Sequence, residues 1–260
     1  MPNFAIITEP LCKVSSTPVC PMSLGYLECG IPISGEQWAA RADAYASLIS
    51  EHLSADTVWL DAGCGLRLLE DDTDRLENWL ATHCGRIVGM DVSVMSHRNI
   101  DTLVRGSIYE LPFASGSFDL VTCNMVVEHL DRPAAAFAEV TRCLRPGGAF
   151  VISTPNLLNY GILSNAVASR LLPDRWRLRL VSNSDERKPD DIFRVRYKAN
   201  TLRRLARLLN ASGLQVHKAI PFRQHVPFFR KIERLETLLM KLTPVSALLV
   251  CAHKNPVSWE

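Results

Sequence analysis

The sequence predicts an α/β fold, with a doubly wound, mostly parallel seven-stranded sheet and an antiparallel last strand. Short β-rich runs alternate with helical periods between residues 57 and 153, which is the pattern of βαβ units in parallel sheets. A turn with two glycines, Asp61-Ala62-Gly63-Cys64-Gly65, joins the first run to a helix. The second run ends on an acidic residue, Asp91, at the edge where open α/β sheets bind ligands.

Each expected element follows from a local pattern. Apolar residues at three- and four-residue spacing predict helices, and β-branched or aromatic runs predict strands. Pro133 suits a first helical turn, Asn200 suits an N-cap, and Gly213 suits a helix end. The expected helices cover 37–53, a stretch up to residue 80, 133–144, 200–213 and 229–242, and the expected strands cover 57–60, 86–90, 103–104, 118–123, 149–153, 214–220 and 247–252.

The chain is expected to have an irregular arm at 1–35 and one domain at 36–260. The alternation of strands and helices breaks at about 156–199, and an excursion of this length is typical of a functional lid. In its 170–180 segment, arginines alternate with leucines and a tryptophan. This basic lid would suit an anionic acceptor or a peripheral contact with acidic lipids, or would be a solvated helix.

The net charge of +2 conceals an asymmetry. Residues 1–169 hold 10 Lys and Arg against 19 Asp and Glu, whereas residues 170–260 hold 19 against 8. Such a split indicates an anionic partner for the basic part, or a pairing of the two parts within the chain.

Composition excludes several classes of protein. Hydrophobic residues make up 47% of the chain, which favours a packed core, and no apolar run is long enough to span a bilayer. The first ten residues lack the positive region of a signal peptide. Eight cysteines without a CxxC pair indicate reduced thiols rather than a disulfide scaffold or a metal site. We therefore expect a cytoplasmic protein without a metal.

The glycine turn indicates a ligand that approaches the backbone closely. A pyrophosphate site would need a third glycine three residues after Gly65, but Leu68 stands there. An acidic residue just before the first glycine would repel pyrophosphate. Asp61 instead suits a cationic ligand with amino and sulfonium groups.

Asp91 lies at the end of the second strand, where a carboxylate can accept hydrogen bonds from both hydroxyls of a ribose. The alternative is an aspartate that only caps the following helix.

Several blocks occur together in the order found in one family. The chain resembles the class I S-adenosylmethionine (SAM)-dependent methyltransferases, of the type 11 group that includes the ubiquinone and menaquinone enzymes, which have a Rossmann-like fold. The resemblance is strong over about residues 55–155. The matching blocks are 58–65, 89–93, 106–113, 118–121, 128–130 and 144–148.

The resemblance implies a set of cofactor-binding residues. The glycine turn would surround the methionine part of SAM, Asp91 would bind the ribose, and Val92 would lie against the adenine face. Ser107 and Ile108 would meet the adenine edge, and two residues after the fourth strand would line the methyl-transfer side. The full set is Asp61, Ala62, Gly63, Cys64, Gly65, Asp91, Val92, Ser107, Ile108, Asn124 and Met125.

Three departures from the family pattern bear on cofactor binding. Arg67 replaces the usual third glycine, and Ser107 replaces the usual acidic residue near adenine. Residues 70–74 lengthen the stretch between the two aspartates. These departures leave open a SAM-binding protein without activity, and a nucleotide-dependent oxidoreductase is a further alternative.

His129 is the candidate general base, because an imidazole can deprotonate a nucleophile near neutral pH. The alternative is a histidine that only packs or caps before Pro133. Asn124-Met125-Val126-Val127 differs from the motif of enzymes that methylate base amino groups, so a nucleic-acid acceptor is disfavoured. We expect methyl transfer to oxygen or carbon of a small-molecule or lipid-like acceptor.

Overall fold

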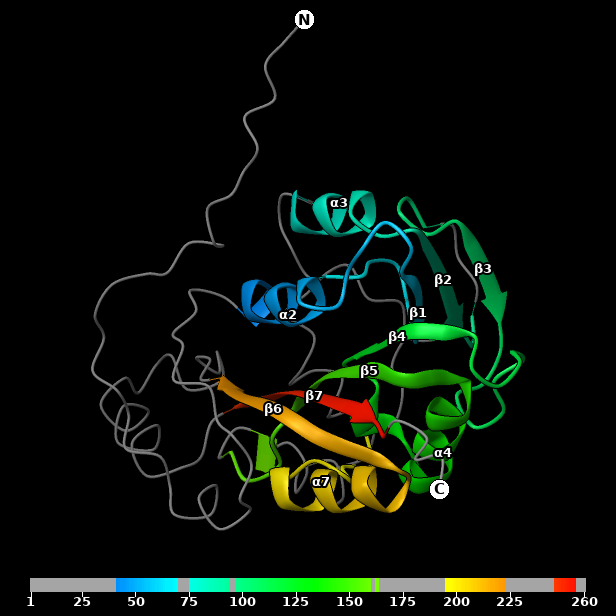
Figure 1. Cartoon of the computed structure of the whole chain (residues 1–260). Helices are drawn as coiled ribbons and strands as arrows, with labels where there is room; N and C mark the ends of the chain where they lie inside the picture. The colour runs from blue at the N-terminus through cyan, green and yellow to red at the C-terminus, as the bar shows by residue number, and fades with distance from the viewer. Residues whose placement is uncertain are drawn as a thin grey trace, which may run out of the picture.

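The computed structural model describes residues 41–69, 75–93, 97–159, 162–163, 195–222 and 246–255. Within these residues the chain forms one seven-stranded sheet in the order β3-β2-β1-β4-β5-β7-β6 (Figure 1). The strands are β1 (Val58–Ala62), β2 (Arg86–Asp91), β3 (Thr102–Arg105), β4 (Phe118–Asn124), β5 (Leu144–Pro155), β6 (Leu214–Phe222) and β7 (Ala247–Lys254).

Strands β1 to β5 pair in parallel, and β7 pairs antiparallel with both β5 and β6. The predicted fold class is therefore confirmed, including the antiparallel last strand. The order reverses between β1 and β4, which is the switch point where doubly wound sheets bind ligands.

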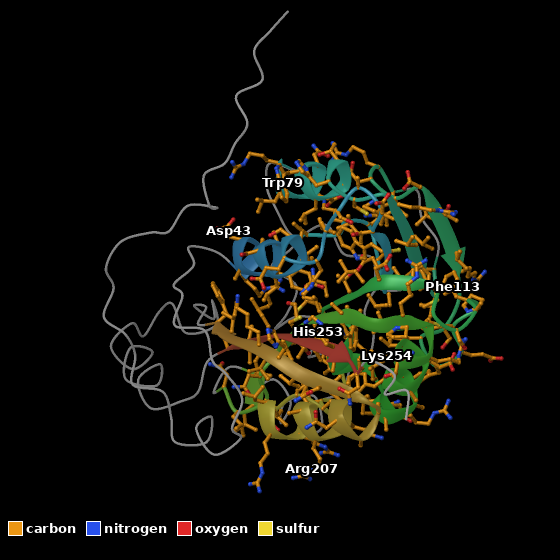
Figure 2. The ribbon with its side chains drawn as sticks, in the orientation of Figure 1. Asp43, Trp79, Phe113, Arg207, His253 and Lys254 are labelled. Carbon is orange, nitrogen blue, oxygen red and sulfur yellow. The ribbon has the colours of Figure 1, made fainter. Side chains whose placement is uncertain are left out.

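Helices cover both faces of the sheet (Figure 1). One face packs against α2 (Arg41–Ser50) and α3 (Arg75–Thr82), and the other against α4 (Pro133–Cys143) and α7 (Leu202–Ala211). Because side chains alternate along a strand, neighbours such as Trp59 and Leu60 belong to different cores. The outer face of α7 is basic, and Arg207 points away from the sheet (Figure 2).

The start of α7 differs from the prediction. Thr201, not Asn200, is the N-cap, and its side chain accepts a hydrogen bond from the Arg204 amide. The side-chain amide of Asn200 is buried and donates instead to the Thr154 hydroxyl at 2.7 Å and to the Pro155 carbonyl at 3.1 Å. The Asn200 side chain therefore bonds to β5, although the local sequence pattern predicted it as the cap of the helix.

Several predictions lie outside the described residues: the arm at 1–35, the basic 170–180 segment with most of the lid, the 70–74 insertion and the helix at 229–242. In the part of the chain that is described, no helix is long and apolar enough to cross a membrane.

Candidate functional site

The carboxyl ends of the parallel strands bring the predicted site residues to one edge of the sheet. Asp61 lies near the end of β1, Asp91 ends β2, and Asn124 ends β4. Since β1 lies between β2 and β4, these three side chains come from neighbouring strands. We refer to this edge as the carboxyl edge.

Asp61 is a buried carboxyl group with one direct hydrogen-bond donor. The Thr122 hydroxyl donates to its Oδ1 at 2.6 Å, and the Trp59 indole nitrogen donates to the same hydroxyl at 2.7 Å. Burial raises the pKa of Asp61 to about 7, although the Thr122 hydrogen bond acts in the opposite direction. A buried carboxyl group of this kind gains from a cationic ligand, which would favour its charged form.

The glycine turn places backbone where side chains cannot fit. Gly63 has a φ of 84°, and a Cβ there would lie 2.3 Å from a methyl group of Val126. Gly65 has a φ of 50°, yet a Cβ there would meet nothing within 4 Å. Gly63 thus allows close packing against the segment after β4, whereas Gly65 borders open space that a ligand could use.

Asp91 connects the glycine turn to the end of β2. Its Oδ2 accepts from the Gly65 amide at 3.1 Å, and its Oδ1 accepts from the Ser93 amide at 3.0 Å. An ionised carboxylate has about four acceptor positions, so about two remain for ligand hydroxyls. The side chain is half-buried, which leaves it accessible from the carboxyl edge.

Glu77 anchors the chain that follows the glycine turn. Its buried carboxylate accepts from the amides of Leu68 at 3.1 Å and Leu69 at 3.4 Å. Arg67, which replaces the family's third glycine, is exposed. The turn is therefore held from α3.

The predicted adenine contacts come from the residue after β2, Val92, and from the segment after β3. Val92 is 49% exposed and Leu66 is 60% exposed, so two apolar side chains near the carboxyl edge are accessible to a flat ring. The Ser107 hydroxyl accepts from the Tyr109 amide at 3.3 Å and can still donate. Ile108 is buried in the core, which leaves its backbone rather than its side chain for a ligand.

Similar burial applies to two residues of the glycine turn, Ala62 and Cys64. Burial raises the pKa of the Cys64 thiol to about 12, and Asp61 and Asp91 add to this effect. The thiol is therefore neutral, and these two positions offer a ligand only their backbone groups.

The end of β4 is held by α2. The Arg41 guanidinium donates to Asn124 Oδ1 at 3.0 Å and to the Ser153 hydroxyl at 2.6 Å. Met125 then adopts a φ of 55°, a left-handed conformation that is uncommon for a residue with a side chain. Its amide donates to the Ser153 carbonyl at 2.8 Å, so the chain turns sharply at this edge. Backbone strain of this kind is concentrated at functional sites.

His129 lies on a short 3-10 helix, η1 (Val127–His129), that follows β4. Its side chain is half-buried, whereas that of Glu128 is buried and accepts from the Thr154 hydroxyl at 3.0 Å. The Glu128 carbonyl accepts from the amides of Arg196 and Tyr197. The described end of the predicted lid therefore attaches beside the candidate base.

Three residues of the site were absent from the sequence prediction: Thr122, Glu77 and Arg41. Each acts on a partner from another part of the chain, at sequence separations of 61 for Thr122 and Asp61, 9 for Glu77 and Leu68, and 83 for Arg41 and Asn124. A polar residue inside an otherwise apolar strand was the available signal for Thr122. Glu77 and Arg41 had no comparable signal, because charged residues are common on helices.

Known proteins match the same part of the chain. Residues 60–152 match a family model described as a methyltransferase domain. A protein of Mycolicibacterium smegmatis, named probable S-adenosylmethionine-dependent methyltransferase, is 27% identical over 150 residues, which cover 52% of this chain and 55% of that protein. A ubiquinone biosynthesis O-methyltransferase of Xanthomonas oryzae is 32% identical over 127 residues, which cover 44% and 51%. The chain thus spans about half the length of these curated relatives.

The fold has solved counterparts as well. The crystal structure of a SAM-dependent methyltransferase from Mesorhizobium loti aligns with a TM-score of 0.53 and 18% identity, over 83% of this chain and 98% of that one. At this identity the likeness shows a shared fold. The matched methyltransferase domain agrees with that fold, and the Mycolicibacterium and Mesorhizobium proteins are both named as SAM-dependent.

Proposed function

We propose that this protein transfers the methyl group of SAM to an oxygen or carbon atom of a small-molecule or lipid-like acceptor. The observation that carries the proposal is the placement of two carboxyl groups, Asp61 and Asp91, beside a glycine turn that borders open space. When bound, SAM supplies an electrophilic methyl group, and S-adenosylhomocysteine is the product.

We assign the cofactor contacts by the chemistry of each group. Asp61 would attract the amino group of the methionine part, and the Gly65 backbone would allow close approach. The remaining acceptor positions of Asp91 would take the ribose hydroxyls. Val92 would cover one face of adenine, and Ser107 with the backbone of Ile108 would meet its edge.

We place the acceptor beyond the end of β4. Asn124 and Met125 would line the methyl-transfer side, held by Arg41. His129 would take the proton from an acceptor hydroxyl or carbon on an imidazole nitrogen. Alignment of the acceptor with the methyl group could supply much of the rate enhancement.

The acceptor class rests on two kinds of support. The Xanthomonas relative is named for ubiquinone biosynthesis, and Leu158, which follows β5, is 52% exposed among residues near this edge. The five described cysteines are free thiols, which supports the expected cytoplasmic setting. The anionic acceptor and the membrane contact remain predictions from the basic 170–180 segment.

Titration calorimetry with S-adenosylhomocysteine tests the cofactor site. The wild type should bind in the micromolar range and should not bind NAD, and Asp91→Ala should lose the affinity. Acceptor screening should then give turnover that falls in His129→Ala while S-adenosylhomocysteine affinity is kept. Binding without turnover on any acceptor would favour the alternative of a SAM-binding protein without activity.

A further inference from the structure

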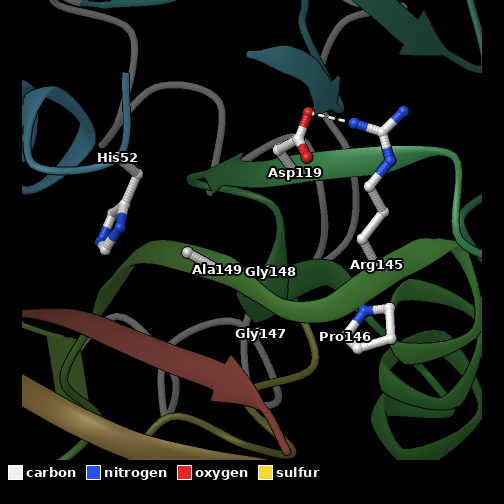
Figure 3. A pocket seen from close by; sticks show the side chains of 7 residues that line it. All are labelled: His52, Asp119, Arg145, Pro146, Gly147, Gly148 and Ala149. Carbon is white, nitrogen blue, oxygen red and sulfur yellow. Dashed lines mark hydrogen bonds and ion pairs between the residues drawn. The ribbon is translucent and has the colours of Figure 1, made fainter. Parts of the chain in front are cut away.

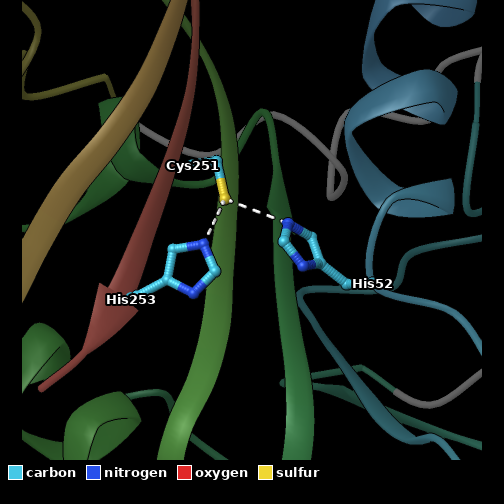
Figure 4. A group of neighbouring side chains, drawn as sticks. All are labelled: His52, Cys251 and His253. Atoms are coloured by element: carbon cyan, nitrogen blue, oxygen red, sulfur yellow. Dashed lines mark hydrogen bonds between the residues drawn. The ribbon is translucent and has the colours of Figure 1, made fainter. Parts of the chain in front are cut away.

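A group of metal-ligand side chains lies on the face of the sheet that α2 covers, three strands away from β1. His52 follows α2, and Cys251 and His253 lie on β7 (Figure 4). The Cys251 sulfur is 3.2 Å from His52 Nε2 and 3.6 Å from His253 Nε2. One ligand atom from each residue lies within 4.8 Å of the others.

The fold accounts for this meeting of distant residues. Cys251 and His253 are two positions apart on a strand, so they point to the same face of the sheet. That face is covered by α2, and Cys251 belongs to the core that α2 helps to form. The backbone amide of His52 donates to the Ile49 carbonyl at 2.9 Å, and its imidazole contacts Cys251 of β7.

The distances match those of a tetrahedral metal site. Zinc bonds of about 2.3 Å to sulfur and about 2.0–2.1 Å to nitrogen imply a sulfur-to-nitrogen separation of about 3.6 Å. The two observed separations, 3.2 and 3.6 Å, are close to this value. One thiol and two imidazoles are also the ligand types that zinc prefers.

A hydrogen bond fixes the orientation of one imidazole. His253 Nδ1 lies 3.4 Å from the Gly147 carbonyl, which can only accept. Nδ1 therefore carries the proton in the neutral ring, and the lone pair of Nε2 faces the sulfur. Metal-bound histidines almost always donate their second nitrogen in this way, to a carbonyl or a carboxylate.

A pocket of about 250 Å³ reaches one member of the group, His52, from solvent (Figure 3). It is lined by His52, by Asp119 and Arg145, and by the 146–149 segment that includes Gly147. The pocket lies at the amino end of β4, so it is separate from the carboxyl edge. It opens one side of the His52 ring to solvent, and a metal site needs an entry path of this kind.

We propose that His52, Cys251 and His253 bind a zinc ion, with water in the fourth position. The ion would join the end of α2 to β7. A separate ion pair between Glu51 and Lys218, at 2.8 Å, already joins the same end of α2 to β6. At the other end of α2, Arg41 donates a hydrogen bond to Asn124. The ion would therefore also stabilise the helix that supports the carboxyl edge. The proposal is independent of the methyl-transfer function, and either can fail alone.

The protonation states of the free protein are compatible with this role. Burial lowers the pKa of His52 to about 4, and the nearby imidazole of His253 adds to the effect, so the ring is neutral. Burial raises the pKa of the Cys251 thiol to about 12. The sulfur is therefore protonated without metal, and binding releases the thiol proton to solvent as the sulfur–zinc bond forms.

The test is metal titration of the full chain, purified under reducing conditions and stripped with a chelator. Zinc should bind in calorimetry at one ion per chain, and Co²⁺ should give a thiolate-to-cobalt charge-transfer band. Loss of a ligand's hydrogen-bond partner costs about 10–100-fold in metal affinity, so loss of the ligand itself in Cys251→Ser should cost at least about 100-fold. His253→Gln should behave similarly, and Cys251→Ser should lose the band.

Two matched variants control for unspecific binding. His217→Gln removes an exposed imidazole whose ring centre is 5.2 Å from that of His253, and Cys84→Ser removes a half-buried thiol elsewhere. Both should bind zinc as the wild type does, and circular dichroism should show that every variant is folded. No binding by the folded wild type, or undiminished binding by Cys251→Ser, would overturn the proposal.

Discussion

Two groups of polar side chains on one sheet are brought together in different ways. At the carboxyl edge, Asp61 and Asp91 lie in the last residues of β1 and β2, within 31 residues of sequence, and the Gly65 amide of the glycine turn donates to Asp91. In the second group, His52 and Cys251 are 199 residues apart, and only the packing of α2 against β7 brings them together. The residues of the carboxyl edge occur in local sequence motifs, whereas His52, Cys251 and His253 come together only in the folded chain.

This difference matters for how each site can fail. The carboxyl edge depends on individual groups that contact a ligand, so single substitutions should change affinity strongly. The group of His52, Cys251 and His253 joins two elements that already pack together. Its loss should therefore mainly change stability.

The largest effect is expected for Asp91→Ala. The variant would remove the proposed acceptor for two ribose hydroxyls, and hydrogen bonds to a charged group contribute about 1.5–3 kcal/mol each. Affinity for S-adenosylhomocysteine should fall at least about 100-fold in calorimetry. Asp56→Ala, which removes an exposed carboxylate before β1, is the matched control and should bind normally.

Because Asp91 also accepts from the Gly65 amide, a gentler variant is needed beside it. Asp91→Asn keeps a side-chain oxygen for one backbone hydrogen bond and should show an intermediate loss. If Asp91→Ala binds like the wild type while remaining folded, the assignment of the ribose contact is wrong.

The fold and the positions of Asp61 and the glycine turn at a strand end were predictable for a physical reason. Strand, turn and helix follow one another within a few residues, so the register that places Asp61 and the glycines is local. The ends of parallel strands then meet without further information. The same logic located Asp91 and Asn124 at strand ends, and the last strand, predicted at 247–252, is observed at Ala247–Lys254.

The supporting residues could not be predicted, because their roles depend on contacts across the fold. Thr122 lies beside Asp61 only because β1 and β4 pair. Asn200 does not cap the helix as predicted, because its side chain donates a hydrogen bond to Thr154. The zinc proposal is a similar case. The absence of a close cysteine pair led to an expectation of no metal, but one ligand of this group lies on another element.

The next effect concerns the pH dependence of cofactor binding. Asp61 has a pKa of about 7, and a bound ammonium group would favour its ionised form. Below this pH the carboxyl group must lose a proton before it can pair with the ligand. Affinity for S-adenosylhomocysteine should therefore fall about tenfold between pH 8 and pH 6. Asp61→Asn should bind more weakly with a flat profile over this range, and a flat wild-type profile would argue against the Asp61 contact.

A smaller effect is expected for zinc and stability. Zinc at ten times its Kd should stabilise the native state by about 1.4 kcal/mol, because it binds only the folded group. This corresponds to a rise of about 3 °C in Tm for a chain of this size. The rise should be absent in Cys251→Ser and present in His217→Gln, and differential scanning fluorimetry measures it. An equal rise in both variants would assign the ion to other ligands.

The smallest effect is expected for Arg67→Gly, which restores the glycine found in the family. The Arg67 side chain is exposed, and the amides of Leu68 and Leu69 are held by Glu77 rather than by a special backbone at position 67. The substitution should therefore change S-adenosylhomocysteine affinity by less than about threefold, within the range of exposed substitutions. A large gain in affinity would instead mean that the arginine weakens the site, and the chain would then resemble a binding protein that has lost activity. Glu77→Gln provides the contrast, because it weakens the anchor of the same turn and should lower affinity more than Arg67→Gly does.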